Sequence, residues 1–536
     1  MLVTLIFQEV DRLLRTLVPR KSVYFAFDGP APLAKLMTQR SRRAKRRARD
    51  GGGGAAAAAA ADMPAPVEEG PPPTAEELAA AALAEARKRR KARYRVARGD
   101  GVDPLAMAPG TELMAYLASS LEYWCVSRLQ SDRRYEHVTA IVSGPHVAGE
   151  GELKIIDYLH TSVAPTDSVV IVGSDADIIL QGVLTTCVRD FFVYIGGAPR
   201  EPATLLSVWM LVRQLDELFP GESAAVRADF VVLCLLNGND YLPKLRGSSF
   251  PRLWNRYKRL KSASGGHGSA MEEESATVTA ASAGGLGVGR FYDVESYLRG
   301  ILWTLAMYVD GVCPDFTYMY TKKYSPSPAV LVAWIRAHDG DPPGAMTPPI
   351  SLTPPLPPHK ATLALLPPRG AHLLPGPLRP LIATPAAAAQ FISDVDGTFL
   401  VDRLHAAVDA IPLSAYTLSE RRRTMLGAPQ RFRRPPGAVS RLMPVEAIPP
   451  PPGRRFGRLT PRPAVDRVTL ALTAKPPCRP WPAAVRFRAL LPSLAAGVRG
   501  GVRPAVALRR EREGEAWAVV GMAALAGGSL HGLSRR

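Results

Sequence analysis

The stretch VVIVGSDADIILQG, residues 169–182, decides the fold of this sequence. Val169–Val172 form a short apolar run that predicts a buried strand, and Gly173 begins the turn that ends it. Asp175 follows in this turn, and Asp177 opens a segment with the character of a helix. A strand that leads through an acidic turn into a helix is the repeating unit of a parallel α/β sheet.

The same alternation extends along the chain on both sides of this stretch. Strands are predicted at 23–27 and 138–143, and the apolar run at 230–236 is interpreted as a further strand. Helices are predicted at 2–18, 35–49, 74–99, 112–129, 153–160 and 292–308, and shorter ones at 387–391 and 401–410. We therefore predict an α/β protein with a mostly parallel sheet flanked by helices.

Shifts in composition divide the chain into four parts. Residues 1–261 form the core domain, which is interrupted by a Gly-, Ala- and Pro-rich low-complexity insert at 51–73. Residues 262–289 have the composition of a flexible linker, and residues 290–430 form a second region that is partly helical and rich in proline. Residues 431–536 are predicted to be a basic, largely disordered tail.

The net charge of +19 comes almost entirely from the C-terminal part of the chain. Residues 421–536 contain 23 Lys or Arg and 5 Asp or Glu, so the rest is nearly neutral. Such a basic segment favours a polyanionic partner. Drift of a GC-rich coding sequence towards Arg, Ala, Pro and Gly would explain the composition equally well. Two Arg-rich pieces, Arg421–Arg423 and Arg431–Arg434, have the composition of a nuclear import signal. The same composition is equally typical of a basic disordered segment without such a role.

The cysteines and the hydropathy pattern exclude several protein classes. The five cysteines are scattered without a CxxC pair, which argues against a zinc site or a disulfide framework and fits a reducing compartment. No apolar run approaches the ~18 residues of a membrane span. The opening residues lack the basic region of a signal peptide. We expect an intracellular protein, with the nucleus favoured over the cytoplasm.

Acidic residues gather where the predicted strands end or where helices begin. In a parallel sheet these positions meet outside the carboxyl ends of the strands. A single Asp in such a place is usually a helix cap or a turn residue, whereas four clusters in series favour a common site. The six carboxylates are Asp28, Glu150, Glu152, Asp175, Asp177 and Asp240.

Six carboxylates in one cleft repel one another unless cations neutralise them. Mg²⁺ prefers hard oxygen ligands and keeps part of its water shell, and Mn²⁺ is the alternative. Two such ions ~4 Å apart activate a water and stabilise the leaving oxygen of a phosphodiester. The sequence therefore predicts that all six carboxylates are catalytic metal ligands and that the site holds two ions.

Four motifs that contain these carboxylates resemble, in the same order, those of the XRN-type 5′→3′ exoribonucleases. The motifs are FDGPAPLAKLMTQRSRR, PHVAGEGELKIIDYL, GSDADIILQG and FVVLCLLNGNDYLPKL. The resemblance covers residues 1–245 apart from the insert and returns weakly near 297–312 and 361–374. It implies a core like that of PIN and flap nucleases. It also implies a function in RNA degradation and mRNA turnover, by processive hydrolysis of single-stranded RNA with a 5′-monophosphate.

One face of the helix at 35–49 carries donors that suit a phosphate. Lys35, Gln39, Arg42 and Arg43 are spaced so that they share this face. The resemblance implies that they form the pocket for the 5′-phosphate. Without the resemblance, these residues would be interpreted as part of a solvated basic helix. That interpretation still applies to neighbouring residues such as Arg40.

The sequence departs from the resembled family at its beginning. That family opens with a strand that carries an acidic metal ligand and is followed by a His. This sequence shows no counterpart, and Asp11, on the first predicted helix, does not replace it. We expect the neighbouring strand to have an exposed edge, and activity to depend on whether an upstream segment supplies the missing motif.

An incomplete gene model or a non-catalytic relative would explain the difference. The alternative functions are an RNA-binding pseudo-nuclease and a structure-specific flap or DNA nuclease.

Overall fold

The computed structural model describes most of residues 2–434 and two short segments beyond them. The described ranges are 2–50, 102–185, 187–188, 190–196, 203–264, 288–289, 291–338, 346–393, 399–434, 466–469 and 517–522. The insert at 51–73, the predicted helix at 74–99 and most of the predicted linker lie outside them. None of the described helices has both the length and the apolar character needed to cross a membrane.

The described strands form one eight-stranded sheet, in the order β5-β4-β3-β10-β1-β2-β8-β9, and a small hairpin of β6 and β7. Parallel pairs join β4, β3, β10, β1 and β2, and antiparallel pairs lie at both margins. The sheet is therefore mixed, where the sequence predicted a mostly parallel one. The strands are β1 (Ser22–Ala26), β2 (Thr139–Ser143), β3 (Ser168–Val172), β4 (Asp190–Ile195), β5 (Thr204–Ser207), β6 (Val288–Gly289), β7 (Tyr292–Asp293), β8 (Gln430–Arg433), β9 (Asp466–Thr469) and β10 (Trp517–Met522).

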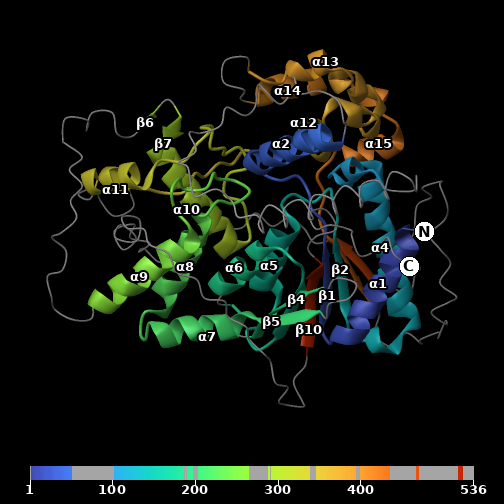
Figure 1. The fold of residues 1–536 in the computed structure, drawn as a ribbon. Coiled ribbons are helices and arrows are strands. Elements are labelled where there is room, and N and C mark those ends of the chain that lie inside the picture. Colours follow the sequence, from blue (N-terminus) through green and yellow to red (C-terminus); the bar gives the residue numbers. More distant parts are fainter. Residues whose placement is uncertain are drawn as a thin grey trace, which may run out of the picture.

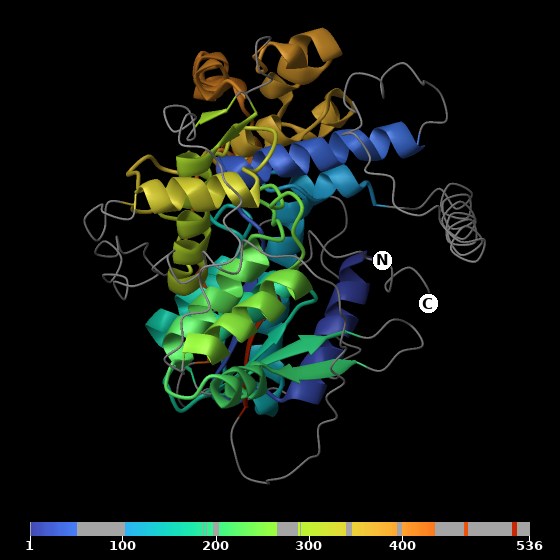
Figure 2. The same ribbon diagram turned by 60° about the vertical axis from the view of Figure 1, so that its left-hand side comes forward.

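Helices cover both faces of the sheet (Figures 1 and 2), so the prediction of an α/β protein is confirmed. Side chains of α1 and α4 form a core with one face, and those of α5, α6, α7, α8, α9 and α10 form a core with the other. The helices are α1 (Leu2–Leu17), α2 (Leu33–Asp50), α4 (Glu112–Ser131), α5 (Gly151–Ser162), α6 (Ala176–Leu184), α7 (Val208–Leu218), α8 (Ser223–Leu235), α9 (Phe250–Ser264), α10 (Val294–Asp310), α11 (Pro328–Ala337), α12 (Pro358–Leu365), α13 (Pro385–Ala389), α14 (Val401–Asp409) and α15 (Leu418–Arg423).

Strand β1 contributes to both cores. Val23 and Phe25 pack with α1 and α4, whereas Tyr24 and Ala26 pack on the opposite face with α5. This division follows from the geometry of a strand, in which successive side chains point to opposite faces. Because β1 is buried on both faces, the turn that follows it has a fixed position relative to the helices.

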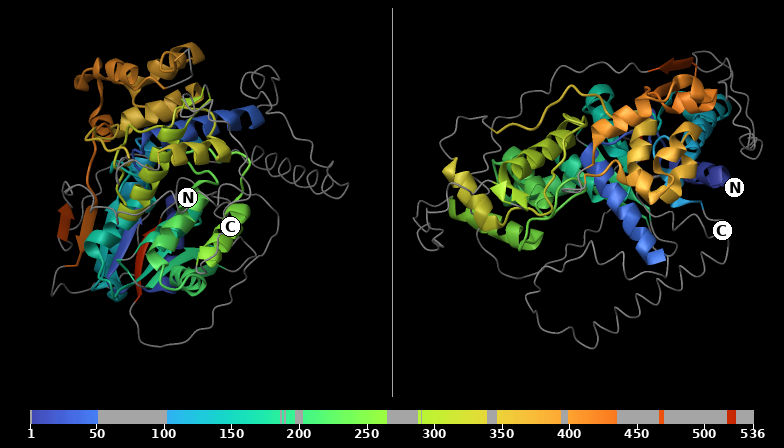
Figure 3. Two further views of the ribbon diagram at one scale, coloured as in Figure 1. Left: turned by 90° about the vertical axis from the view of Figure 1, so that its left-hand side faces the viewer. Right: turned by 90° about the horizontal axis from the view of Figure 1, so that it is seen from above.

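A third core joins α2 to the second region of the chain. Leu36 of α2 packs in this core with residues of α12 and α14. Arg40, which the sequence suggested would be solvated, donates to the Ala364 carbonyl at 2.7 Å and lies over the Phe399 ring. Figure 3 shows α2 running alongside the orange helices of this region. The helix with the predicted phosphate-binding residues is thus held in place by the second region of the chain.

Strand β10 lies between β1 and β3 and is parallel to both. Val519 of β10 pairs with Val23 of β1, which also pairs with β2 on its other side. The prediction of an exposed edge next to β1 is therefore wrong. An unpaired edge inside a sheet leaves backbone groups without partners, and a segment of the same chain supplies them. Strands β9 and β10 and most of β8 belong to the predicted disordered tail, and residues 435–465, 470–516 and 523–536 of this tail lie outside the described residues.

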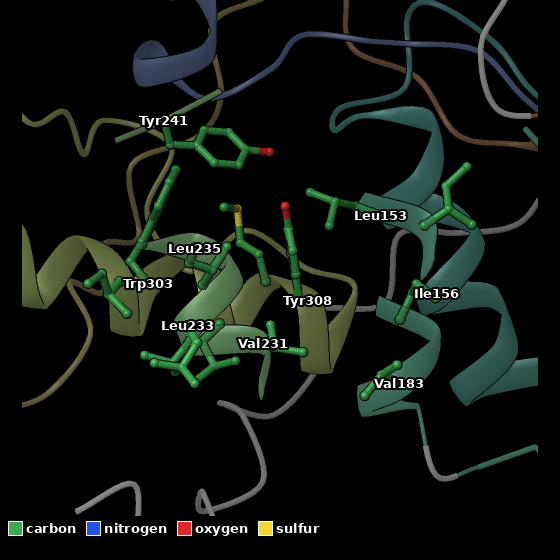
Figure 4. Close-up of a cluster of buried hydrophobic side chains, with 14 of the residues drawn as sticks. Leu153, Ile156, Val183, Val231, Leu233, Leu235, Tyr241, Trp303 and Tyr308 are labelled. Carbon is green, nitrogen blue, oxygen red and sulfur yellow. The ribbon is translucent and has the colours of Figure 1, made fainter. Parts of the chain in front are cut away.

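Residues 230–236 form the last part of α8 and its end, and the prediction of a strand here is wrong. Val231, Leu233 and Leu235 are all buried, and Figure 4 shows them in a cluster with side chains of α5 and α10. A short apolar run fits a helix buried on several sides as well as it fits a buried strand. Asp240 therefore follows a helix and a tight loop, and not a strand end.

Candidate active site

Carboxylates from four segments of the chain approach one another beside the buried cluster of Figure 4. One follows β1, two stand at the start of α5, two at the start of α6, and one lies in the loop after α8. Electrostatic interactions or a shared cation link each of them to at least one other. These residues are the six predicted from the sequence: Asp28, Glu150, Glu152, Asp175, Asp177 and Asp240.

The start of α5 packs directly against the end of β1. The Gly151 N–H donates to Asp28 Oδ1 at 2.9 Å, so the positive end of the helix orients this carboxylate. A Cβ atom at Gly29 would lie 1.7 Å from the Val147 carbonyl oxygen. Only glycine therefore fits beside Asp28 without a shift of the backbone.

Lys35 of α2 stands between two of the carboxylates. Its Nζ lies 2.6 Å from Glu150 Oε2 and 2.5 Å from Asp240 Oδ2, and its side chain is only 10% exposed. Burial acts to lower the pKa of Lys35, but the attraction of Glu150, Glu152 and Asp240 raises it well above its ordinary value. Lys35 is therefore a charged group that holds α5 and the Asp240 loop together.

Arg42, two turns further along α2, reaches the same loop. Its Nη2 donates to Asp240 Oδ1 at 2.5 Å, although the Arg42 side chain is 58% exposed. Burial acts to raise the pKa of Asp240, but Lys35 and Arg42 together lower it below its ordinary value. Asp240 is thus ionised and engaged by two cations from one helix.

The remaining negative charge is less well compensated. Burial, and then repulsion from Glu150, raises the pKa of Glu152 well above its ordinary value. Burial, and then repulsion from Asp175, raises the pKa of Asp177 to about 6. The pKa of Glu150 is also raised, chiefly by burial, although Lys35 opposes this. The cluster therefore favours the arrival of further positive charge.

The donor chemistry fits a hard divalent cation, because all six side chains are carboxylates. In the structure, however, the Lys35 ammonium group holds the point at which Glu150 and Asp240 converge. Within the described ranges, no three Asp, Glu, His or Cys side chains surround one point closely enough to ligate a metal ion. The role of the six carboxylates as metal ligands stays a prediction.

The four residues predicted to hold a 5′-phosphate all lie on α2, but they differ in their surroundings. Lys35 and Arg42 contact carboxylates of the site, which agrees with their predicted common face. Gln39 and Arg43 are half-buried. Phosphate binding by these residues also stays a prediction, and two of them are tied to the acidic cluster.

Two residues of the site were missed from the sequence. The Tyr241 hydroxyl donates to Glu150 Oε1 at 2.5 Å, and Figure 4 shows its ring above the buried cluster. Lys154, whose pKa burial lowers to about 7, donates to the Phe27 carbonyl at 2.8 Å. In the sequence Tyr241 directly follows Asp240, and Lys154 lies two residues after Glu152. This proximity to predicted carboxylates is the signal by which both residues could have been found. His146, in the loop between β2 and α5, is half-buried, and burial lowers its pKa.

Comparisons with known proteins agree with this geometry. Residues 1–193 match the family described as "XRN 5'-3' exonuclease N-terminus". The chain is 30% identical over 329 residues to 5'-3' exoribonuclease 2 of Gallus gallus, a match that covers 49% of this chain and 31% of that protein. It is 32% identical over 311 residues to the 5'-3' exoribonuclease 2 homolog of Caenorhabditis elegans, with 48% and 30% covered.

A similar match is found to 5'-3' exoribonuclease 1 of Schizosaccharomyces pombe, with 26% identity over 299 residues and 49% and 20% covered. The chain thus spans less than a third of the length of these relatives. The family match contains the cationic face of α2 and five of the six carboxylates, and Asp240 lies beyond its end. Over residues 1–193 the chain therefore resembles the N-terminal nuclease region of the XRN family.

Proposed function

We propose that this chain is a 5′→3′ exoribonuclease that hydrolyses RNA with a 5′-monophosphate. The observation that carries the proposal is the contact of Lys35 and Arg42 with Glu150 and Asp240. It places cations suited to a terminal phosphate beside carboxylates suited to a metal-dependent hydrolysis. The names of the relatives, 5'-3' exoribonucleases, support the same reaction class.

The carboxylates would hold divalent cations, which we take to be two Mg²⁺ ions or Mn²⁺ in their place. Such ions activate a water and stabilise the leaving oxygen of a phosphodiester. The surrounding residues keep the carboxylates oriented: the Gly151 N–H fixes Asp28, and the Tyr241 hydroxyl fixes Glu150. The holders would be Asp28, Glu150, Glu152, Asp175, Asp177 and Asp240.

The face of α2 would select the 5′ end of the RNA. Arg42 is exposed enough for its guanidinium group to meet a substrate phosphate in bidentate fashion. Gln39 and Arg43 lie on the same face, one turn apart. Lys35, which is buried, would bring its charge to the inner side of the phosphate.

Digestion of a 3′-labelled RNA with a 5′-monophosphate tests the reaction. In the presence of Mg²⁺ we expect stepwise removal of nucleotides, and loss of this activity in the Asp175→Asn/Asp177→Asn variant. Glu136→Gln/Glu217→Gln neutralises two exposed acidic residues elsewhere and should leave the rate unchanged. If the site variant digests the RNA as fast as the native protein, the carboxylates do not catalyse the reaction.

Selection of the 5′ end needs a separate measurement. Arg42→Ala should reduce the ratio of rates on 5′-phosphate and 5′-hydroxyl RNA by roughly 10- to 100-fold, because a hydrogen bond to a charged group contributes about 1.5–3 kcal/mol. Arg421→Ala, on the exposed part of α15, serves as a control. Equal rates of the native protein on both RNAs would rule out a phosphate pocket on α2.

A second candidate function is an RNA-binding pseudo-nuclease. The observation that favours it is Lys35, whose ammonium group holds the point between Glu150 and Asp240 where a metal ion would be needed. This candidate predicts RNA binding that weakens steeply with salt, without cleavage in Mg²⁺ or Mn²⁺. Any metal-dependent shortening of RNA that the Asp175→Asn/Asp177→Asn variant lacks would exclude it.

A further inference from the structure

Two loops next to the candidate active site present basic side chains. Lys244 and Arg246 lie in the loop that follows α8, only a few residues after Asp240, and Lys322 and Lys323 lie in the loop that follows α10. Lys244, Arg246 and Lys323 are exposed. None of the ion pairs found among the described residues involves any of these four cations.

A buried serine fixes the two loops relative to each other. Ser325 Oγ donates to the Lys244 carbonyl at 2.8 Å and accepts from the Arg246 N–H at 3.2 Å. The first loop is also tied to α8, because the Leu245 N–H donates to the Leu236 carbonyl at 2.9 Å. The backbone positions that carry the basic side chains are therefore set by the fold.

An aromatic side chain organises two of the cations. The Arg246 guanidinium lies 4.9 Å, and the Lys323 ammonium 5.3 Å, from the centre of the Tyr324 ring. Phe291, which is 53% exposed, meets the same ring edge-on at a centroid distance of 6.2 Å. The surface thus combines fixed positive charge with an exposed aromatic ring, and we call the set Lys244, Arg246, Phe291, Lys322, Lys323 and Tyr324 the loop platform.

Two acidic side chains at the start of α10 are engaged elsewhere. Asp293 Oδ1 caps α10 by accepting the Ser296 N–H at 2.9 Å, and Glu295 pairs with Arg299 at 2.9 Å. The loop platform therefore keeps its positive charge and attracts a polyanion. Single-stranded nucleic acid combines one negative charge per residue with flat bases that stack on aromatic rings.

We propose that the loop platform binds single-stranded RNA beside the active site. The inference rests on the proposed function in taking RNA as the ligand, but binding to the platform does not require cleavage. It assigns to these six residues a grip on the strand that is separate from the 5′-phosphate face of α2. Lys244 links the two surfaces, because its loop also carries Asp240.

Binding of a fluorescent single-stranded RNA, measured by anisotropy in EDTA from about 50 to 200 mM salt, tests the proposal. Each phosphate contact contributes about 0.7 to the slope of log K against log salt concentration for a single strand. Arg246→Gln/Lys323→Gln should therefore weaken binding and reduce the slope by about 1.4. Arg20→Gln/Arg133→Gln, which removes two exposed charges before β1 and β2, should change neither.

Each outcome separates the platform from the proposed function. An unchanged slope in Arg246→Gln/Lys323→Gln overturns the inference, even if the protein digests RNA. So does an equal loss in the control, or an acidic peptide of matched charge that displaces the RNA equally well. A reduced slope supports the platform, even if no RNA is cleaved. The single variant Lys244→Gln, expected to lower the slope by about 0.7, repeats the test with one exposed side chain.

Discussion

Replacing Lys35 with Met should destabilise the fold and make its stability depend on added divalent cations. The Lys35 ammonium contacts Glu150 at 2.6 Å and Asp240 at 2.5 Å, and the residue is 8% exposed. Removing one partner of a buried ion pair costs about 3–5 kcal/mol. In the variant Arg42 still pairs with Asp240. We therefore expect a loss of unfolding free energy at the lower end of this range, about 3 kcal/mol in EDTA.

Mg²⁺ should restore part of this stability in Lys35→Met, because Glu150 and Asp240 then lack their shared cation. Binding at 100 times the Kd contributes about 2.7 kcal/mol. Urea unfolding followed by circular dichroism, in EDTA and in Mg²⁺, measures both effects.

A matched control is Lys360→Met, which removes another buried lysine that pairs with a carboxylate, here Asp409 at 2.7 Å. It should lose stability without recovery in Mg²⁺, because Asp409 is largely exposed. If Lys35→Met is as stable as the native protein in EDTA, the network is not energetically important. If Mg²⁺ stabilises both variants equally, the carboxylates beside Lys35 do not form a cation site.

Three further predictions concern the rest of the fold. Arg128→Met should cost about 3–5 kcal/mol in urea unfolding because it leaves the buried Asp11 carboxylate unpaired, and Arg128→Met/Asp11→Leu should recover most of the loss; a double variant no more stable than the single one would contradict this. Gly29→Ala should lower the proposed nuclease activity and destabilise the fold by about 1–3 kcal/mol, since its Cβ would lie 1.7 Å from the Val147 carbonyl oxygen. Unchanged activity and stability would show that this turn relaxes. Burial, and then the charge of Lys360, lowers the pKa of His359 to about 4. The neutral imidazole therefore contributes fully to folding stability above pH 6.5, and on acidification towards pH 4 the protein loses on the order of 3 kcal/mol of this stability. His359→Phe should flatten this pH dependence of the urea midpoint, and equal slopes would argue against the buried neutral imidazole.

Elements with local signals were predictable from the sequence. Residues 169–182 lie in β3, α6 and the turn between them, with Asp175 as the cap that accepts the Asp177 N–H. The apolar periodicity of residues 2–18 predicted α1, and the basic segment after Pro32 predicted α2. In each case neighbouring residues alone decide the outcome, through periodicity or capping.

Features that depend on distant contacts were not predictable in the same way. The run at 230–236 has no periodicity because several helices surround it, so its helical state is decided by packing. The pairing of Lys35 with Glu150 and Asp240 joins three segments whose proximity exists only in the fold. Spacing along α2 placed Lys35 on the correct face, but it did not reveal what that face contacts.

The position of β10 has a consequence for the order in which the chain folds during its synthesis. The ribosome makes β1 and β3 early, yet the strand that pairs with both is made only at residues 517–522. Until then each of these strands has one side without a partner, and such edges invite pairing with other chains. Pairings between distant segments form slowly, and incomplete sheets are prone to aggregate. We therefore expect the nascent protein to depend on chaperones until β10 enters the middle of the sheet.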